Sequence, residues 1–169
     1  ATDMLVEGRH FRADVTTPES VGRKAVIQNF ADIEAMGARP IAALLAIAAP
    51  PTTPLSVVEG LARGVGAATE AYSTELVGGD VSQSRQLVIS VAAIGSLGGN
   101  REPLTMAAAR PGQRVVAHGT IGYSAAGFAL LDAGVDIPEA LEPLVRAHQV
   151  PQLTPGRGVV ARAAGATSM

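Results

Sequence analysis

An unbroken apolar run at residues 41–49 constrains the fold of this chain more than any other feature of its sequence. The run is nine residues long and is followed by Pro50-Pro51. A membrane-spanning helix needs roughly 20 apolar residues, so this run is too short to cross a bilayer. A short, continuously apolar segment that ends at proline instead predicts a strand buried within a sheet.

Helix-start signals stand on both sides of this predicted strand. Thr17-Pro18 and Thr53-Pro54 each place a capping residue before a proline at the first helical position. We therefore expect one helix from residue 17 to about 36, ended by Gly37, and a second from residue 53 to about 72.

The other elements follow from β-branched runs and turn residues. Gly78-Gly79-Asp80 is predicted to form a tight turn after a short strand. A cluster of Arg, Pro and Gly predicts a domain boundary within residues 101–112. The further predicted strands are 75–77, 87–94 and 114–117, and the further predicted helices are 124–132, 138–148 and an alanine-rich one after Pro155.

Composition limits the core and excludes several functions. Only five residues are aromatic and 31 are alanine, which favours helices that lie close to a sheet. The absence of cysteine excludes disulfides, zinc-thiolate sites, iron–sulfur clusters and thiol catalysis. A net charge of -2 with so few aromatic residues argues against nucleic-acid binding. The single lysine, Lys24, is followed by Ala25, so a Walker-type phosphate loop is excluded.

Three aspartates are candidates for ligand binding. From the predicted turn, Asp80 either reaches a ligand or hydrogen-bonds its own backbone. Asp3 lies at the edge of a predicted strand, and Asp32 lies one helical turn after Asn29. Each of these two is individually compatible with a solvated carboxylate. Taken together, the three would suit a cation that prefers oxygen ligands, such as magnesium.

Two further motifs are compatible with binding but are less specific. His10, followed by Phe11, is either a histidine at a strand end or a ligand-binding residue. The glycine turn at residues 119–122 precedes a predicted helix, whose first backbone amides can bind an anion.

Four segments in this order resemble the thiamine-monophosphate kinases, a bacterial family in the superfamily of aminoimidazole ribonucleotide synthetase. The resemblance covers essentially the whole chain. The segments are Thr2-Asp3-Met4-Leu5-Val6-Glu7-Gly8-Arg9-His10-Phe11, residues 29–40 beginning Asn29-Phe30-Ala31-Asp32, Leu76-Val77-Gly78-Gly79-Asp80, and residues 119–131.

The resemblance implies a role for each matching residue. His10 would contact thiamine monophosphate, and Gly79 and Asp80 would contact ATP. The residues implied as magnesium ligands are Thr2, Asp3, Asp32 and Asp80. The implied reaction transfers the γ-phosphoryl group of ATP onto the phosphate of thiamine monophosphate. A phosphate monoester has a second pKa of about 6 and is largely dianionic at pH 7, so no catalytic base is expected.

The resemblance also implies an α+β fold. Residues 1–104 would form an N-terminal domain with a mixed sheet, flanking helices and a dimer-forming surface. Residues 105–169 would begin an α/β C-terminal domain. We expect a cytoplasmic homodimer that binds neither nucleic acid nor membrane. The chain ends look like interior sequence, so we expect segments that complete the metal site to be missing at both ends.

Departures from the family pattern leave alternatives open. An arginine that approaches ATP in the family is replaced within Met106-Ala107-Ala108-Ala109, where Arg110 or Arg101 could take its place. Tyr123 stands where the family usually has aspartate. The alternatives are a sister ATP-using enzyme of the superfamily and a dimeric homologue that has lost catalysis. The absence of cysteine disfavours a selenophosphate synthetase, and the residue 3–11 motif disfavours a purine-pathway synthetase.

Overall fold

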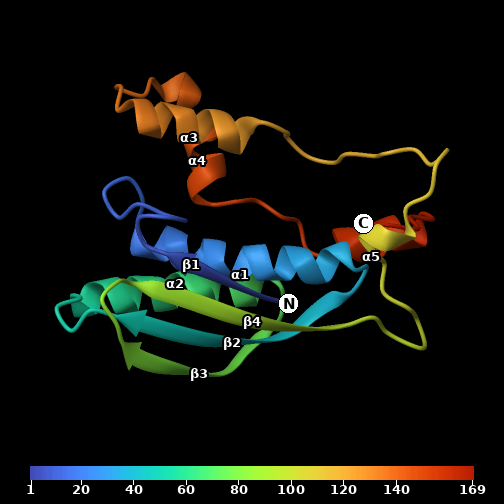
Figure 1. Ribbon diagram of the computed structural model, residues 1–169, viewed down its shortest axis with the longest axis horizontal. Helices are drawn as coiled ribbons and strands as arrows, with labels where there is room; N and C mark the ends of the chain where they lie inside the picture. Colours follow the sequence, from blue (N-terminus) through green and yellow to red (C-terminus); the bar gives the residue numbers. More distant parts are fainter.

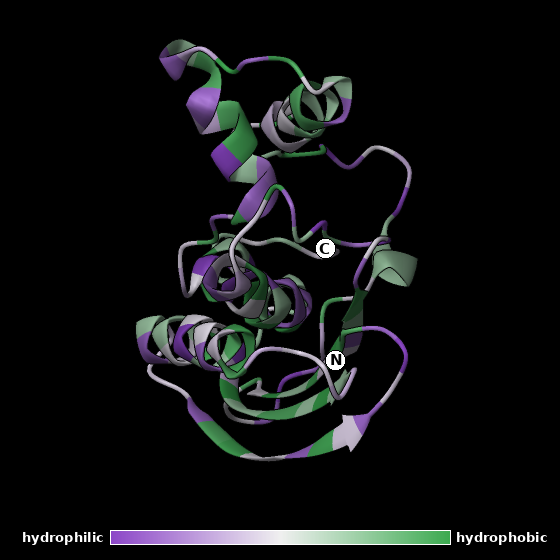
Figure 2. Ribbon diagram, turned by 90° about the vertical axis from the view of Figure 1, so that its left-hand side faces the viewer, coloured by the Kyte–Doolittle hydropathy of each residue, from purple (hydrophilic) through white to green (hydrophobic).

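The computed structural model describes all 169 residues and has one four-stranded mixed sheet with helices on one face (Figures 1 and 2). This is the α+β class expected from the sequence. The strands are β1 (Thr2–Val6), β2 (Arg39–Ala49), β3 (Glu75–Gln83) and β4 (Val88–Ser96). The helices are α1 (Pro18–Ala35), α2 (Leu55–Ala71), α3 (Tyr123–Ala133), α4 (Glu142–Gln149) and α5 (Arg157–Ala163), with short 3-10 turns at Met106–Ala108 and Glu139–Leu141.

The strand order is β1-β4-β2-β3. β4 is antiparallel to both of its neighbours, whereas β2 and β3 are parallel and are joined through α2. Directly paired residues point to the same face of a sheet. The register therefore defines two adjacent rows on opposite faces: Asp3-Val91-Leu45-Gly79, and Met4-Ser90-Ala46-Asp80.

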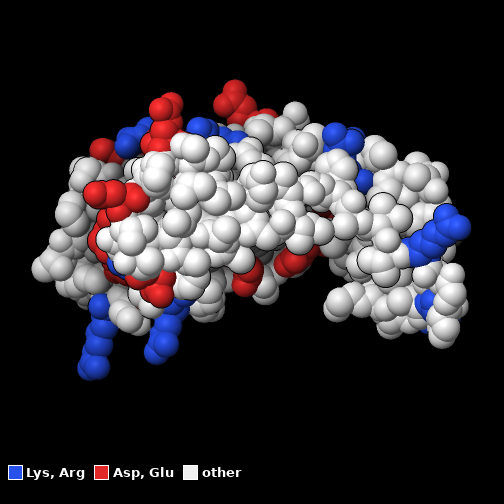
Figure 3. All heavy atoms as spheres, turned by 90° about the horizontal axis from the view of Figure 1, so that it is seen from above, with Lys and Arg blue, Asp and Glu red and all other residues white.

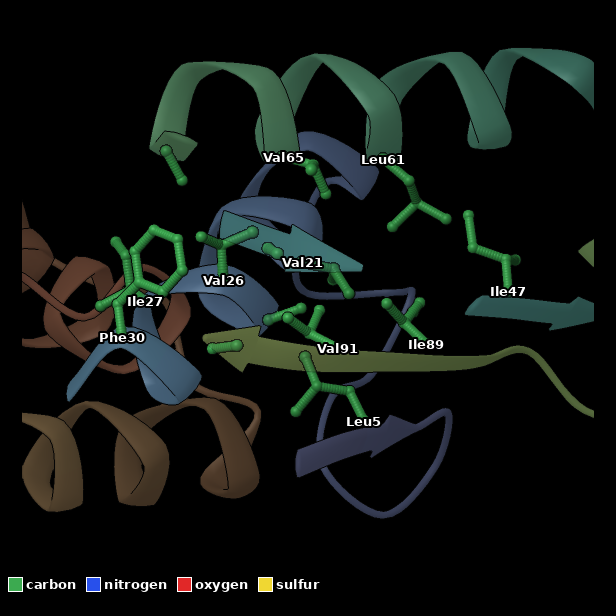
Figure 4. Packing of buried hydrophobic residues seen from close by; sticks show 14 of the residues in the cluster. Leu5, Val21, Val26, Ile27, Phe30, Ile47, Leu61, Val65, Ile89 and Val91 are labelled. Atoms are coloured by element: carbon green, nitrogen blue, oxygen red, sulfur yellow. The ribbon is translucent and has the colours of Figure 1, made fainter. Parts of the chain in front are cut away.

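α1 and α2 cover one face of the sheet and form the core with it (Figure 4). Glycine allows the two helices to approach closely: a Cβ atom on Gly22 would lie 2.2 Å from the carbonyl oxygen of Leu61. A Cβ atom on Gly64 would lie 1.9 Å from the carbonyl oxygen of Glu19. Fully buried core side chains include Val26, Phe30, Leu61, Val65, Ile89 and Val91.

The predicted buried strand at residues 41–49 is present as β2, but it is buried on one face only. Ala43 and Ile47 are buried against the helices, whereas Leu44 is 40% exposed. Helices cover only one face of the sheet, so alternate residues of β2 lie on an open apolar face (Figure 2).

The helix predictions succeeded where the signals were local. The Thr17 hydroxyl caps α1 by accepting a hydrogen bond from the Ser20 N–H at 3.1 Å, and Gly37 follows with a positive φ of 70°. Thr53 does not cap α2, because the helix begins one residue later and Pro54 takes the N-cap position. The Thr53 N–H donates to the Pro50 carbonyl in the preceding turn.

Beyond residue 97 the chain contributes helices and connections only. The predicted strand at 114–117 is not formed: no strand of the sheet pairs with it, and Val115 and Val116 are almost fully exposed. α3 and α4 pack together above α1, and α5 lies beside the C-terminal end of α1 (Figure 1). None of the helices is both long and apolar enough to cross a membrane.

Candidate functional site

The Gly78-Gly79-Asp80 motif lies in the middle of β3, so the predicted turn is wrong. Gly78 and Gly79 pair with Leu44 and Leu45, and a register shift leaves Val77 as an extra residue. A Cβ atom on Gly79 would lie 1.9 Å from the carbonyl oxygen of Leu45. The glycine therefore permits close approach of two strands next to a β-bulge, rather than a chain reversal.

Asp80 extends from the open face of the sheet and is exposed. Its carboxylate accepts a hydrogen bond from the Ser82 hydroxyl at 2.8 Å. Ala46, Ser90 and Met4 lie on the same row across the sheet. The carboxylate is thus available to a ligand or partner that approaches this face.

Asp3 and Thr2 lie on β1 at the opposite edge of the sheet. Asp3 pairs with Val91 and so belongs to the helix-covered face, although it is exposed at the edge. Its carboxylate accepts a hydrogen bond from the Met4 N–H at 3.1 Å. The Thr2 hydroxyl donates to the carbonyl of Val91 at 3.1 Å.

Asp32 is exposed on α1, on the side that faces away from the core. Lys24 and Gln28 precede it at intervals of four residues, so the three form a stripe about 12 Å long. The Oε1 atom of Gln28 is buried and has no hydrogen-bond partner. Partial burial lowers the pKa of Lys24.

His10 is held from two sides at the Lys24 end of this stripe. Its Nδ1 accepts a hydrogen bond from the Val6 N–H at 3.0 Å, and its carbonyl accepts one from Lys24 Nζ at 3.1 Å. When Nδ1 accepts, a neutral imidazole carries its proton on Nε2, which becomes a donor. Lys24 was not predicted to belong to the site. Its spacing of eight residues from Asp32 on one helix was the available signal.

α4 packs over the same end of α1. The Ser124 hydroxyl, at the start of α3, lies 3.3 Å from Nδ1 of His148, and the His148 ring lies against Phe128 with centroids 5.2 Å apart. Partial burial and the nearby charge of Lys24 lower the pKa of His148. The anion-binding role suggested for residues 119–122 stays a prediction, although a helix does begin directly after Gly122.

Arg110 does not extend toward the other candidate residues. Its guanidinium donates to the carbonyls of Ala107 and Ala109 at 2.8 and 2.9 Å. It is therefore used to hold its own loop.

The structure brings His10 and Lys24 together but separates Asp3 from Asp80. Two strands intervene between β1 and β3, a separation of roughly 14 Å at about 4.8 Å per strand. No group of three Asp, Glu, His or Cys side chains lies close enough to hold a metal ion. The oxygen donors fit magnesium chemically, but a single copy of this chain does not gather a complete ligand set.

The face drawn in Figure 3 has both positive and negative side chains and no continuous basic area.

Comparison with known proteins places this sheet and its helices in a family. The model for the AIR synthase related protein, N-terminal domain, matches residues 1–97. The chain belongs to the AIR synthase related family. The matched AIR synthase related domain ends one residue after β4 and therefore contains the whole sheet, α1 and α2.

The similarity to individual members of the AIR synthase related family extends beyond that domain. A thiamine-monophosphate kinase from Corynebacterium glutamicum is 65% identical over 170 residues, which cover 99% of this chain and 51% of that protein. The thiamine-monophosphate kinase of Mycobacterium tuberculosis is 44% identical over 169 residues, covering 100% of this chain and 50% of that protein. The chain thus spans about half the length of these relatives.

A solved structure also matches nearly the whole chain and about half of its own length. The structure described as AaThiL complexed with AMPPCP and TMP superimposes with a TM-score of 0.90 at 33% identity. The match covers 99% of this chain and 53% of that one.

Proposed function

We propose that the protein containing this chain is a thiamine-monophosphate kinase. It transfers the γ-phosphoryl group of ATP to thiamine monophosphate and forms thiamine diphosphate and ADP. The observation that carries this proposal is the match along 99% of the chain to a structure described as holding AMPPCP, an ATP analogue, together with TMP. The 65% identity to the C. glutamicum kinase supports it.

The chain's own residues supply positioning rather than covalent chemistry. His10 presents its Nε2 proton to the phosphate-bearing substrate, with its loop fixed by Lys24. Asp80 contacts ATP from the open face of the sheet, and Gly79 contacts it through its backbone. The acceptor phosphate is already ionised near pH 7, so no residue is assigned as a catalytic base.

Magnesium belongs to this proposal as a cation that would neutralise phosphate charge. Thr2, Asp3, Asp32 and Asp80 are the oxygen donors that this chain offers. These residues do not meet within one copy, so substrate phosphates, water molecules or groups outside this copy would complete the magnesium coordination.

A homodimer completes the proposal. The open face of the sheet carries Met4, Leu44 and Ile94, which are 51%, 40% and 48% exposed. An apolar sheet face of this kind fits burial against a second copy. We also propose a domain boundary near residue 104, a cytoplasmic location and a role in thiamine biosynthesis.

Incubating the full-length protein with ATP, magnesium and thiamine monophosphate tests the proposed activity. We expect ATP-dependent formation of thiamine diphosphate, measured by chromatography. Asp80→Asn should abolish it without changing the unfolding temperature, and Glu70→Asn, at an exposed position on α2, serves as the control. A full-length protein that binds ATP but forms no thiamine diphosphate would indicate a sister enzyme. A protein that binds no ATP would indicate the degenerate homologue.

A further inference from the structure

Glu34 is a buried carboxylate that none of the proposed functions uses. It lies near the C-terminal end of α1, two residues after Asp32, and is only 3% exposed. Its Oε1 accepts a hydrogen bond from the Gly156 N–H and its Oε2 accepts one from the Gly158 N–H, both at 2.6 Å. A residue of α1 therefore holds the start of α5, which lies more than 120 residues further along the chain.

No lysine or arginine forms an ion pair with the Glu34 carboxylate. The two ion pairs of the structure, Arg12–Asp14 and Arg63–Glu19, do not involve Glu34. Burying a carboxylate is costly unless it is hydrogen-bonded, and charge-assisted bonds to backbone N–H groups are among the strong ones. A buried charge is weak evidence for stability, but two directional bonds fix geometry. Glu34 therefore specifies a position for α5 more than it adds packing.

The two hydrogen bonds from Gly156 and Gly158 to Glu34 form a clamp between α1 and α5. The backbone around this clamp allows close contact between the two helices. A Cβ atom on Gly158 would lie 1.8 Å from the carbonyl oxygen of Glu34, so only glycine lets α5 approach α1 this closely. A Cβ atom on Gly37 would lie 2.7 Å from Nε of Arg162. Both ends of α5 are thus seated on the end of α1.

α5 and the segment that follows it are both tied to the connection between the two halves of the chain. The Arg162 guanidinium donates to the carbonyl of Glu102, and the Ser168 hydroxyl donates to the carbonyl of Thr105 at 2.8 Å. The Leu104 N–H in turn donates to the carbonyl of Met36 at 3.1 Å. Figure 1 shows this junction, where α5 and the segment around residue 105 lie beside the end of α1.

We propose that Glu34 is a positioning residue for phosphoryl transfer. Its carboxylate fixes α5, together with residues 164–169 that follow it, relative to the end of α1 that carries Asp32. The inference rests on the proposed function, because it concerns the geometry of that reaction. Glu34 contacts no substrate and acts only through the placement of these two segments.

Glu34→Gln in the full-length enzyme tests the proposal. The amide keeps the size of the side chain but turns one acceptor into a donor that faces a backbone N–H. We expect kcat to fall by about tenfold or more, because small displacements remote from the chemistry are costly in transfer reactions. The KM values for ATP and thiamine monophosphate should stay unchanged. Glu70→Gln, the same change at an exposed position on α2, should leave kcat unchanged.

Two further measurements separate positioning from general stability. Hydrogen exchange at the Gly156 and Gly158 amides should accelerate in Glu34→Gln, while the amides of Ile89 and Val91 keep wild-type protection. Glu34→Asp retains the charge and both acceptors at shorter reach and should recover part of kcat. It replaces Glu34→Gln as the deciding variant if the latter does not fold.

A wild-type kcat in the deciding variant overturns the proposal, whatever the exchange rates show. The proposal is also overturned if Glu34→Gln and Glu34→Asp lose kcat only in proportion to a lowered unfolding temperature, to the same extent in both. An inactive wild-type enzyme would instead refute the proposed function. In that case accelerated exchange at Gly156 and Gly158 in Glu34→Gln would still show that Glu34 holds α5. The proposed role of Glu34 in catalysis would be refuted together with the proposed activity.

Discussion

At the residue scale, glycine is required at position 79 because of the neighbouring strand and not because of its own backbone conformation. Its φ is not among the positive values found in the chain, whereas the space for a Cβ atom is filled by the carbonyl of Leu45. Chain reversal needs glycine for its conformational freedom, but β3 needs it for lack of a side chain.

Gly79→Ala should therefore destabilise the protein by about 1–3 kcal/mol, because β2 and β3 must separate to admit the methyl group. Chemical denaturation measures this change. Gly66→Ala is the matched control, since Gly66 lies within α2 with no atom near its Cβ position. That substitution should stabilise the protein by roughly 0.5–1 kcal/mol through helix propensity. Equal effects at the two positions would contradict the steric explanation.

His148 illustrates a residue whose environment sets its pH response. Burial and the charge of Lys24 lower its pKa, so the folded protein disfavours the protonated imidazole. Stability from this group is complete above the unfolded pKa of about 6.5 and is lost as pH falls through the lower folded value.

We expect the contact between α4 and α1 to loosen as the pH decreases from 7.5 to 5.5. Hydrogen exchange at the backbone amides of α4 should accelerate over this range in the wild type. His148→Gln lacks the titration, and its α4 amides should respond less to pH. A wild-type and variant pair with identical pH dependence would show that another group is responsible.

At the element scale, the two Thr-Pro signals differ in outcome for a local reason. Thr17 is free to cap α1, whereas Thr53 is engaged through its backbone in the turn that begins at Pro50. The sequence pattern is the same, but in the second case, which follows Pro50-Pro51, the helix start moves by one residue, from Pro54 to Leu55.

Thr17→Ala should lower the free energy of unfolding by about 1 kcal/mol, because the Ser20 N–H loses its acceptor. Thr53→Ala should change it by only a few tenths of that amount, since no side-chain cap is lost. Thermal unfolding of the two variants side by side makes the comparison. A loss at Thr53 as large as that at Thr17 would contradict the observed cap assignment.

The elements that sequence reasoning found are those whose signals lie within the element itself. α1 was predicted from its cap, its proline and Gly37 because these act on their own helix. The extent of β3 was missed because the requirement for Gly79 comes from Leu45, more than thirty residues away. Residues 114–117 have strand-forming side chains, but pairing needs a neighbouring strand and none is present.

At the scale of the whole molecule, the candidate site depends on which face of the sheet each residue occupies. The shared chemistry of Asp3, Asp32 and Asp80 and the family resemblance of their motifs implied that the three belong to one function, but neither contains information on strand order. The register places Asp80 on the open face and Asp3 on the helix-covered face. The distance between them could not be predicted before the order β1-β4-β2-β3 was known.

The proposed homodimer gives the open face a measurable role. Leu44 lies on this face, in the row next to that of Asp80, so a second copy that covers Leu44 also lies beside Asp80. Leu44→Asp would bury a carboxylate without a partner in the dimer. We expect dimer affinity to fall by at least about 2 kcal/mol, or roughly 30-fold in Kd.

Sedimentation equilibrium of the full-length protein measures this change. Leu55→Asp is the control, because Leu55 is 70% exposed on α2, away from the open face, and the same charge there should leave the dimer intact. If the site near Asp80 needs the second copy, the activity of Leu44→Asp should recover at protein concentrations that restore the dimer. A variant that stays dimeric at all concentrations would show that the two copies meet through another surface.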